Sequence, residues 1–219
     1  MSYHGGLVLP PLVTPMVTSM RPGYPYIAPP SPLHPLLCGE LGDKPKLLFD
    51  LSSHSCSPRH STRGGGTHIR LDELSAPATY PPVYRMTITC DHIPQWPITI
   101  ERRVSTTSAA SNLPPELAIW ADIPITAYDV LTAVHHALRI QVSTGNWSNL
   151  SREEQRLVME AYIRRCRRVA GTRWLDVVGG LRRVDYLANR YMFRGLVSQS
   201  IQGGVAHVKL VVGKKTAGW

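Results

Sequence analysis

The sequence predicts an α+β fold: a small antiparallel sheet of hairpins packed against two main helices and preceded by a disordered Pro-rich tail. Three observations lead to this prediction. Apolar and polar residues alternate between residues 84 and 100, as in a half-buried β-hairpin. Two stretches with apolar residues spaced by three and four begin with helix-capping patterns, at Thr126 and at Ser151. Prolines interrupt the first 32 residues too often for a helix.

These patterns divide the chain into three parts. We expect residues 1–32 to be a disordered tail with polyproline-like local structure, residues 33–212 to form a single α+β domain, and residues 213–219 to fray. A chain of 219 residues with 43% apolar residues is long enough for one domain with a buried core. A more specific hypothesis is that the prolines of the tail dock in an aromatic groove of another protein.

The first half of the domain is predicted to contain strands and loops. Residues 47–51 are apolar and short enough for a buried strand, and residues 52–67 are expected to be a loop with Pro58 and three glycines as breakers. Residues 84–90 and 96–100 are the arms of the predicted hairpin, because alternate side chains in each arm are apolar.

Two helices are expected in the second half. Thr126 and Asp129 have the spacing of a capping box, and the apolar residues that follow them mark a buried face: Val130, Leu131, Val134 and Leu138. Gly145 is placed in the linker between the helices. Ser151 and Glu154 form a second capping box.

The second helix is predicted to be amphipathic, with Gly171 as its stop. Its apolar face comprises Val158, Ala161, Tyr162, Cys166 and Val169, and arginines lie roughly opposite. After it, residues 181–196 are rich in strand-forming residues, with a turn expected at residues 188–190, and residues 206–212 are the last predicted strand.

The side chains that could act in catalysis or bind a metal form no recognisable pattern, so no catalytic residue, metal or cofactor is predicted. The four cysteines lack CxxC spacing, and we expect Cys90 and Cys166 to be reduced core residues. A polar loop offers four candidate zinc ligands in no standard spacing, namely His54, Cys56, His60 and His68. Asp185 is expected to form an ion pair with Arg182 or Arg183 rather than to act as a catalytic acid.

The apolar start of the chain lacks the basic residues and the unbroken apolar run of a signal peptide. No segment reaches the roughly 18 apolar residues of a transmembrane helix. We therefore expect an intracellular protein of the cytoplasm or nucleus, which is not secreted.

Several motifs in a fixed order resemble a family of uncharacterised basidiomycete fungal domains, the DUF6699 type, over about residues 33–212. The matching pieces are HPLL at 34–37, LLFDLS at 47–52, PATYPP at 77–82, MTITCDHIPQWPITI at 86–100, ITAYDVLTAVHHAL at 125–138, AYIRRCRR at 161–168, GLRRVDYL at 180–187 and MFRGL at 192–196. The resemblance implies an α+β domain with a variable Pro-rich tail. It implies no activity, substrate, cofactor or catalytic residue.

The clearest functional signal is an uneven charge. Residues 1–138 carry a net charge of −1 and residues 139–219 a net charge of +10. Some arginines near the end of the second helix suit the helix dipole, but their number exceeds that need. The candidate basic face consists of Arg152, Arg156, Arg164, Arg167, Arg168, Arg173, Arg182 and Arg183.

Three functions compete for this basic face. The first is a non-enzymatic interaction module that binds an acidic protein or peptide. The second is binding of RNA or DNA through the same arginines, although no known nucleic-acid-binding motif is present. The third is an enzyme of unrecognised type, against which the lack of convergent catalytic groups counts. Tyrosines and tryptophans between the arginines are expected to pack in the core or in hairpins rather than to stack on bases.

Overall fold

The computed structural model describes residues 32–39, 45–62, 65–102, 123–169 and 180–215, all in the unit that runs from Ser31 to Trp219. The α+β class predicted from the sequence is confirmed. Residues 1–31 of the predicted tail lie outside the described residues, and so do Gly171 and residues 216–219 of the predicted frayed end.

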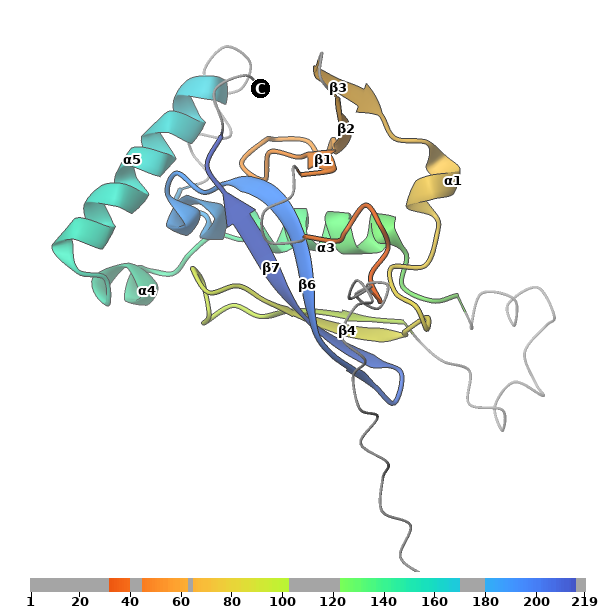
Figure 1. The fold of residues 1–219 in the computed structure, drawn as a ribbon. Helices are drawn as coiled ribbons and strands as arrows, with labels where there is room; N and C mark the ends of the chain where they lie inside the picture. The colour runs from red at the N-terminus through yellow and green to blue at the C-terminus, as the bar shows by residue number, and fades with distance from the viewer. Residues whose placement is uncertain (1–31, 40–44, 63–64, 103–122, 170–179, 216–219) are drawn as a thin grey trace, which may run out of the picture. The chain divides into compact units, whose positions relative to one another are not determined.

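A four-stranded sheet forms the centre of the fold, in the order β5-β4-β7-β6 (Figure 1). The predicted hairpin is confirmed as β4 (Arg85–Thr89) and β5 (Ile98–Glu101), with Met86 opposite Ile100. The long C-terminal hairpin is β6 (Met192–Gln202) and β7 (Val205–Gly213), which contains the predicted last strand.

The two hairpins join differently from the prediction. β4 pairs with β7 in parallel, with Ile88 opposite Val208, so the sheet is mixed rather than purely antiparallel. The pairing follows from burial: Met86, Ile88, Ala206 and Val208 are all buried and continue one apolar surface across both strands.

Close packing of the chain against β6 depends on one glycine. Gly195 has a φ of +123°, and a Cβ there would lie 2.4 Å from the Cα of Gly39. The backbone of Gly39 donates a hydrogen bond to the Leu196 carbonyl, and the Leu196 amide donates one to Leu37. Only glycine allows residues 37–39 to run this close to the strand.

A second, three-stranded sheet in the order β1-β2-β3 corrects the prediction of a loop at residues 52–67. It consists of β1 (Leu47–Leu48), β2 (Arg59–Thr62) and β3 (Gly65–His68). The loop prediction was wrong because β2 and β3 are polar and lack apolar alternation. β2 pairs with β1, with Leu47 opposite His60, and β3 pairs with β2, with His60 opposite Thr67, so backbone hydrogen bonds rather than apolar side chains define both strands.

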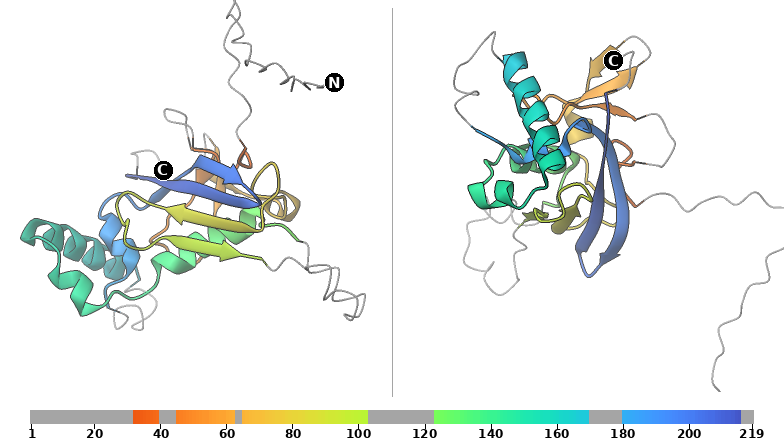
Figure 2. Two further views of the ribbon diagram at one scale, coloured as in Figure 1. Left: turned by 90° about the horizontal axis from the view of Figure 1, so that it is seen from below. Right: turned by 90° about the vertical axis from the view of Figure 1, so that its left-hand side faces the viewer.

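The first predicted helix is α3 (Ala127–Leu138), which packs along β5 (Figure 2). Its capping box is confirmed: Thr126 Oγ1 accepts a hydrogen bond from the Asp129 amide at 3.2 Å, and the Asp129 carboxylate accepts one from the Thr126 amide at 2.9 Å. Val130, Leu131, Val134 and Leu138 are buried as predicted.

Three further helical segments lie around this core. Short helices are α1 (Leu71–Leu74) and α4 (Thr144–Ser148), so Gly145 lies in a helical turn rather than in an irregular linker. The second main helix is α5 (Arg152–Val169). It packs mainly on η2 (Arg183–Leu187) and not on the sheet (Figure 1).

The η2 segment corrects the strand prediction for the first part of residues 181–196. Val184 and Leu187 are buried on a short 3-10 helix, where a spacing of three brings them to the same side. The predicted turn at residues 188–190 therefore links a helix to β6.

Among the described residues, no helix has the length and apolar character needed to cross a membrane.

Candidate functional site

Most of the sequence-predicted basic residues lie on or beside α5, which begins at a well-formed cap. The Ser151 amide donates to Glu154 Oε2 at 2.8 Å, and Ser151 Oγ accepts from the Glu154 amide at 3.3 Å. Glu153 and Glu154 in the first turn also suit the positive end of the helix dipole. The second predicted capping box is therefore confirmed.

The inner face of α5 is held by a buried ion pair. Arg165 is only 4% exposed and Asp185 of η2 only 2%. Arg165 Nε donates to Asp185 Oδ1 at 2.9 Å, and one of its terminal nitrogens donates to Oδ2 at 2.8 Å and to the Gly180 carbonyl at 3.0 Å. Burial alone would lower the pKa of Arg165, but the hydrogen bonds and charge of Asp185 outweigh it and raise the pKa.

The prediction that Asp185 forms an ion pair was right about the interaction but named the wrong arginines. Arg165 lies 20 residues before Asp185 in the chain, one helical turn after Ala161 of the predicted apolar face. The Arg182 amide donates to Asp185 Oδ2 at 2.9 Å. The guanidinium of Arg183 lies over the ring of Trp96, with its Cζ 5.2 Å from the ring centroid.

On the outer side of α5, Arg156 is engaged by two carboxylates. It donates to Glu153 at 2.7 Å and pairs with Glu160 one turn later. The two carboxylates neutralise its charge, so Arg156 adds no positive charge to a binding surface. Hydrogen bonds and charges from both raise its already high pKa further.

The remaining predicted arginines of α5 differ in exposure. Arg152 and Arg167 are exposed, and no hydrogen bond or ion pair holds either within the described part of the chain. Arg164 is half-buried, donates to the Ala188 carbonyl and lies over the Tyr191 ring, 5.1 Å from its centroid. The side chain of Arg168 and the whole of Arg173 lie outside the described residues.

A cleft of about 540 Å³ lies between α5 and the turn that leads from η2 to β6. We call it the basic cleft. Its lining includes Arg164, Arg190 and Lys214, with Glu154, Glu160 and His92 beside them. The structure thus brings Arg164 together with two cations that were not predicted to belong to the site, because they come from the η2–β6 turn and from beyond β7.

His92 lines the basic cleft and contacts one of its cations. Arg190 Nη1 lies 2.9 Å from His92 Nε2. Because a guanidinium only donates, this ring nitrogen accepts the bond and the imidazole is neutral. Partial burial and the charge of Arg190 both lower the pKa of His92.

A model of the DUF6699 family, a family of unknown function, matches residues 47–204. The chain belongs to the DUF6699 family. The matched segment contains β1 to β6, including α5, η2 and every residue of the basic cleft named above except Lys214. No curated protein and no solved structure matches the chain.

The aromatic residues near the arginines of this DUF6699 domain are packed, as predicted. Trp96 and Tyr186 meet edge to face with ring centroids 4.9 Å apart, and Tyr191 is buried. Burial also raises the pKa of Tyr186. Large aromatic side chains that are exposed within the described ranges are Tyr80 and Tyr128, away from the basic cleft. Trp174 lies outside these ranges.

The other candidate groups of the DUF6699 domain lie apart from the cleft. Cys90 is buried as expected, whereas Cys166 is only half-buried, because it lies at the edge of the helix face that packs on η2. His60 of the suggested zinc set contacts Glu73 at 2.9 Å. Within the ranges that the structure describes, no three His, Cys, Asp or Glu side chains are arranged to hold a metal ion.

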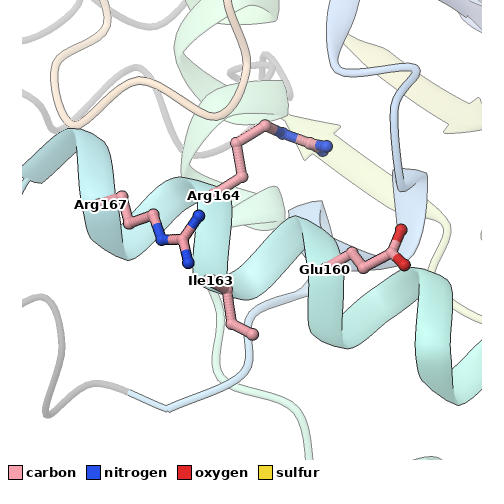
Figure 3. Close-up of a pocket in the computed structure, with 4 residues that line it drawn as sticks. All are labelled: Glu160, Ile163, Arg164 and Arg167. Carbon is pink, nitrogen blue, oxygen red and sulfur yellow. The ribbon is translucent and has the colours of Figure 1, made fainter.

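A second hollow, of about 610 Å³, lies on the outer side of α5 (Figure 3). Its described lining residues all come from this helix and are Glu160, Ile163, Arg164 and Arg167. Glu160 and Arg164 line both hollows. The surface therefore continues from the exposed side of α5 into the basic cleft.

Proposed function

We propose that this DUF6699 domain is a non-enzymatic interaction module that binds an acidic segment of a partner protein in the basic cleft. One observation carries the proposal: Arg164, Arg190 and Lys214 come from separate parts of the chain and line one cavity. Such convergence of cations in a concave site favours binding of carboxylates.

The carboxylates already in the cleft do not neutralise these three cations in the described structure. Glu160 pairs with Arg156, and Glu154 accepts hydrogen bonds from Ser151 at the helix cap. Arg164 contacts a carbonyl and an aromatic ring, neither of which carries a charge. The cleft is therefore left with a surplus of positive charge, in keeping with the net charge of +10 in residues 139–219.

Nucleic-acid binding remains the alternative, but two features favour a protein ligand. Single-stranded nucleic acids are bound by exposed aromatic side chains together with basic ones. The aromatic rings beside the basic cleft are instead engaged in packing, as Trp96 and Tyr186 are with each other. A carboxylate-rich peptide needs only the cations.

The titratable groups of the cleft also favour binding over catalysis. His92 Nε2 accepts from Arg190, which occupies the lone pair that a general base would use. The hydroxyl of Tyr186 is buried and has no hydrogen-bond partner among the described residues. An enzyme of unrecognised type is accordingly the weakest of the three hypotheses.

A titration with a fluorescent peptide of alternating Glu and Asp tests the proposal. At about 50 mM salt, we expect the double variant Arg190→Glu with Lys214→Glu to bind about tenfold more weakly than the wild type. The control variant, Arg59→Glu with Arg70→Glu, makes the same change in net charge at exposed residues outside the cleft. If peptide binding were weakened equally in both variants, the effect would come from net charge alone, and the proposal would be overturned.

The same titration with a single-stranded oligonucleotide separates the alternative. If the ligand is nucleic acid, the logarithm of the association constant should fall with the logarithm of the salt concentration, with a slope of roughly −0.7 for each phosphate contacted. A steep slope, with tighter binding of the oligonucleotide than of the peptide, would assign the cleft to nucleic acid instead.

The biological setting of this module is also a proposal. The motif resemblance favours a basidiomycete source, and the sequence favours an intracellular location. A pull-down from a basidiomycete extract with the wild type and the two double variants would identify partners that depend on the cleft. A Pro-rich tail that docks on another protein would add partners that all three variants retain.

A further inference from the structure

The outer side of α5 is an open helix face with exposed apolar residues. Among the described elements, α5 makes its main contacts with η2, and its buried side chains in the described part are Val158, Ala161 and Arg165. Met159 and Ile163, one helical turn apart, point the other way and are 38% and 40% exposed.

The hollow on this face has the geometry of a helix-packing site. Its lining residues, Glu160, Ile163, Arg164 and Arg167, are spaced at i, i+3, i+4 and i+7. Four residues at this spacing form the hole that receives one side chain of a facing helix in knobs-into-holes packing. In Figure 3, Ile163 lies between Glu160 and Arg167 along the helix.

A second hole of the same kind adjoins the first. The second hole is formed by residues at the same spacing: Arg156, Met159, Glu160 and Ile163. The two holes share Glu160 and Ile163, so they follow one another along the helix face. Consecutive holes accept knobs on successive turns of one partner helix, whereas an extended peptide presents its side chains with a period of two.

We propose that the outer face of α5 receives an amphipathic helix of the acidic partner, an inference that rests on the proposed function. Apolar side chains of that helix fill the two holes and cover Met159 and Ile163. Carboxylates on one flank of the helix meet Arg167, and carboxylates that extend past Glu160 reach Arg164 at the mouth of the basic cleft.

Charge complementarity selects an acidic partner over a second copy of this chain. Arg152 and Arg167 lie on the exposed side of α5 without a carboxylate partner among the described residues, while Glu153 and Glu160 are engaged by Arg156. Two copies of this face would bring unpaired arginines together. An acidic flank instead provides each with a partner.

Two peptides of identical composition test the inference. One carries leucines at i, i+3, i+4 and i+7 with glutamates on one flank, and the other has the same residues scrambled so that no apolar stripe forms. We expect the striped peptide to bind the wild-type protein about tenfold more tightly and to gain helical circular dichroism on binding.

A matched pair of variants locates the binding. Ile163→Ser should weaken the striped peptide about fivefold and leave the scrambled peptide unchanged. Ile140→Ser should change neither, because Ile140 is a similarly exposed isoleucine, at 48%, outside α5. Circular dichroism of both variants confirms that they fold.

The outcomes separate this inference from the proposed function. If both peptides bind equally and both lose binding in the variant Arg190→Glu with Lys214→Glu, the result supports the proposed binding of acidic segments and contradicts the proposed helical partner. Binding of neither peptide overturns both. A dimer in sedimentation equilibrium that dissociates in Ile163→Ser would assign the face to a second copy and overturn the acidic partner.

Discussion

The two main helices of this domain pack in opposite ways. Of the 12 residues of α3, six are buried, and the helix lies against the sheet with an apolar face. In the 18-residue α5, the buried side chains among those described are Val158, Ala161 and Arg165, and the helix lies against η2. One helix is part of the hydrophobic core, and the other is attached to it by a polar contact.

This difference shows how the domain combines stability with an open binding surface. An apolar face as wide as that of α3 must be covered by the sheet. The Arg165–Asp185 ion pair, the contacts of Arg164 with the Ala188 carbonyl and the Tyr191 ring, and a narrow apolar contact hold α5, while most of its surface stays exposed. The arginines and apolar residues on that surface are therefore available to a partner.

The largest expected effect tests whether the ion pair anchors α5. Asp185→Ala leaves Arg165 buried without its carboxylate, which should lower the free energy of unfolding by about 3–5 kcal/mol. Urea denaturation measures this loss. Hydrogen exchange should show that the amides of α5 lose protection before those of α3, because only α5 depends on the pair.

Two variants sharpen this result. Asp72→Ala removes the carboxylate of an exposed pair with Arg70 and should cost less than about 1 kcal/mol. Arg165→Met combined with Asp185→Leu should recover most of the stability, since apolar side chains replace a buried pair well. Asp185→Ala at wild-type stability would show that α5 is anchored by other contacts.

A pH-dependent effect is expected in α3. His135 is 2% exposed, its Nε2 lies 3.0 Å from the Ser53 carbonyl, and its Nδ1 has no hydrogen-bond partner within the described residues. Burial lowers the pKa of His135. The hydrogen bond to Ser53 opposes this shift, and the charges of Arg139, His136 and His54 reinforce it.

The unfolded chain therefore takes up this proton first as the pH falls. The contribution of His135 to stability is complete above pH 6.5 and is lost below it, with a slope of at most about 1.4 kcal/mol per pH unit. His135→Gln should flatten the pH dependence of the unfolding free energy between pH 5 and 7. His136→Gln should change it much less, because His136 is exposed and supplies only one of the neighbouring charges that act on His135. An unchanged slope in His135→Gln would contradict the prediction.

The smallest expected effect is the loss of stability when either helix cap, Thr126 of α3 or Ser151 of α5, is removed. Thr126→Ala removes the cap of the core helix and should cost about 1 kcal/mol of global stability. Ser151→Ala removes the same kind of cap from α5, where we expect local fraying in hydrogen exchange and a smaller change in the urea midpoint. Equal losses would mean that α5 folds and unfolds together with the core.

Local patterns in the sequence predicted most of the helices and strands. Alternation predicted β4 and β5, and the two capping boxes predicted where α3 and α5 begin. They failed at β2 and β3, whose polar residues carry no alternation, and at η2, whose Val184 and Leu187 fit a strand or a short helix equally well. Alternation and capping are signals read from side chains within one segment, whereas β2 and β3 are fixed by backbone pairing with each other and with β1, and η2 is fixed by its packing against α5.

The sequence by itself determined the α+β class, the capped helices and the excess of arginines in the last part of the chain, because these depend on composition and short-range spacing. Only the tertiary structure decided which contacts these arginines make. Arg165 is neutralised by Asp185, Arg183 lies over the ring of Trp96, and Arg164 lines the basic cleft together with Arg190 and Lys214. Such pairings depend on long-range packing, and charge counts do not contain that information.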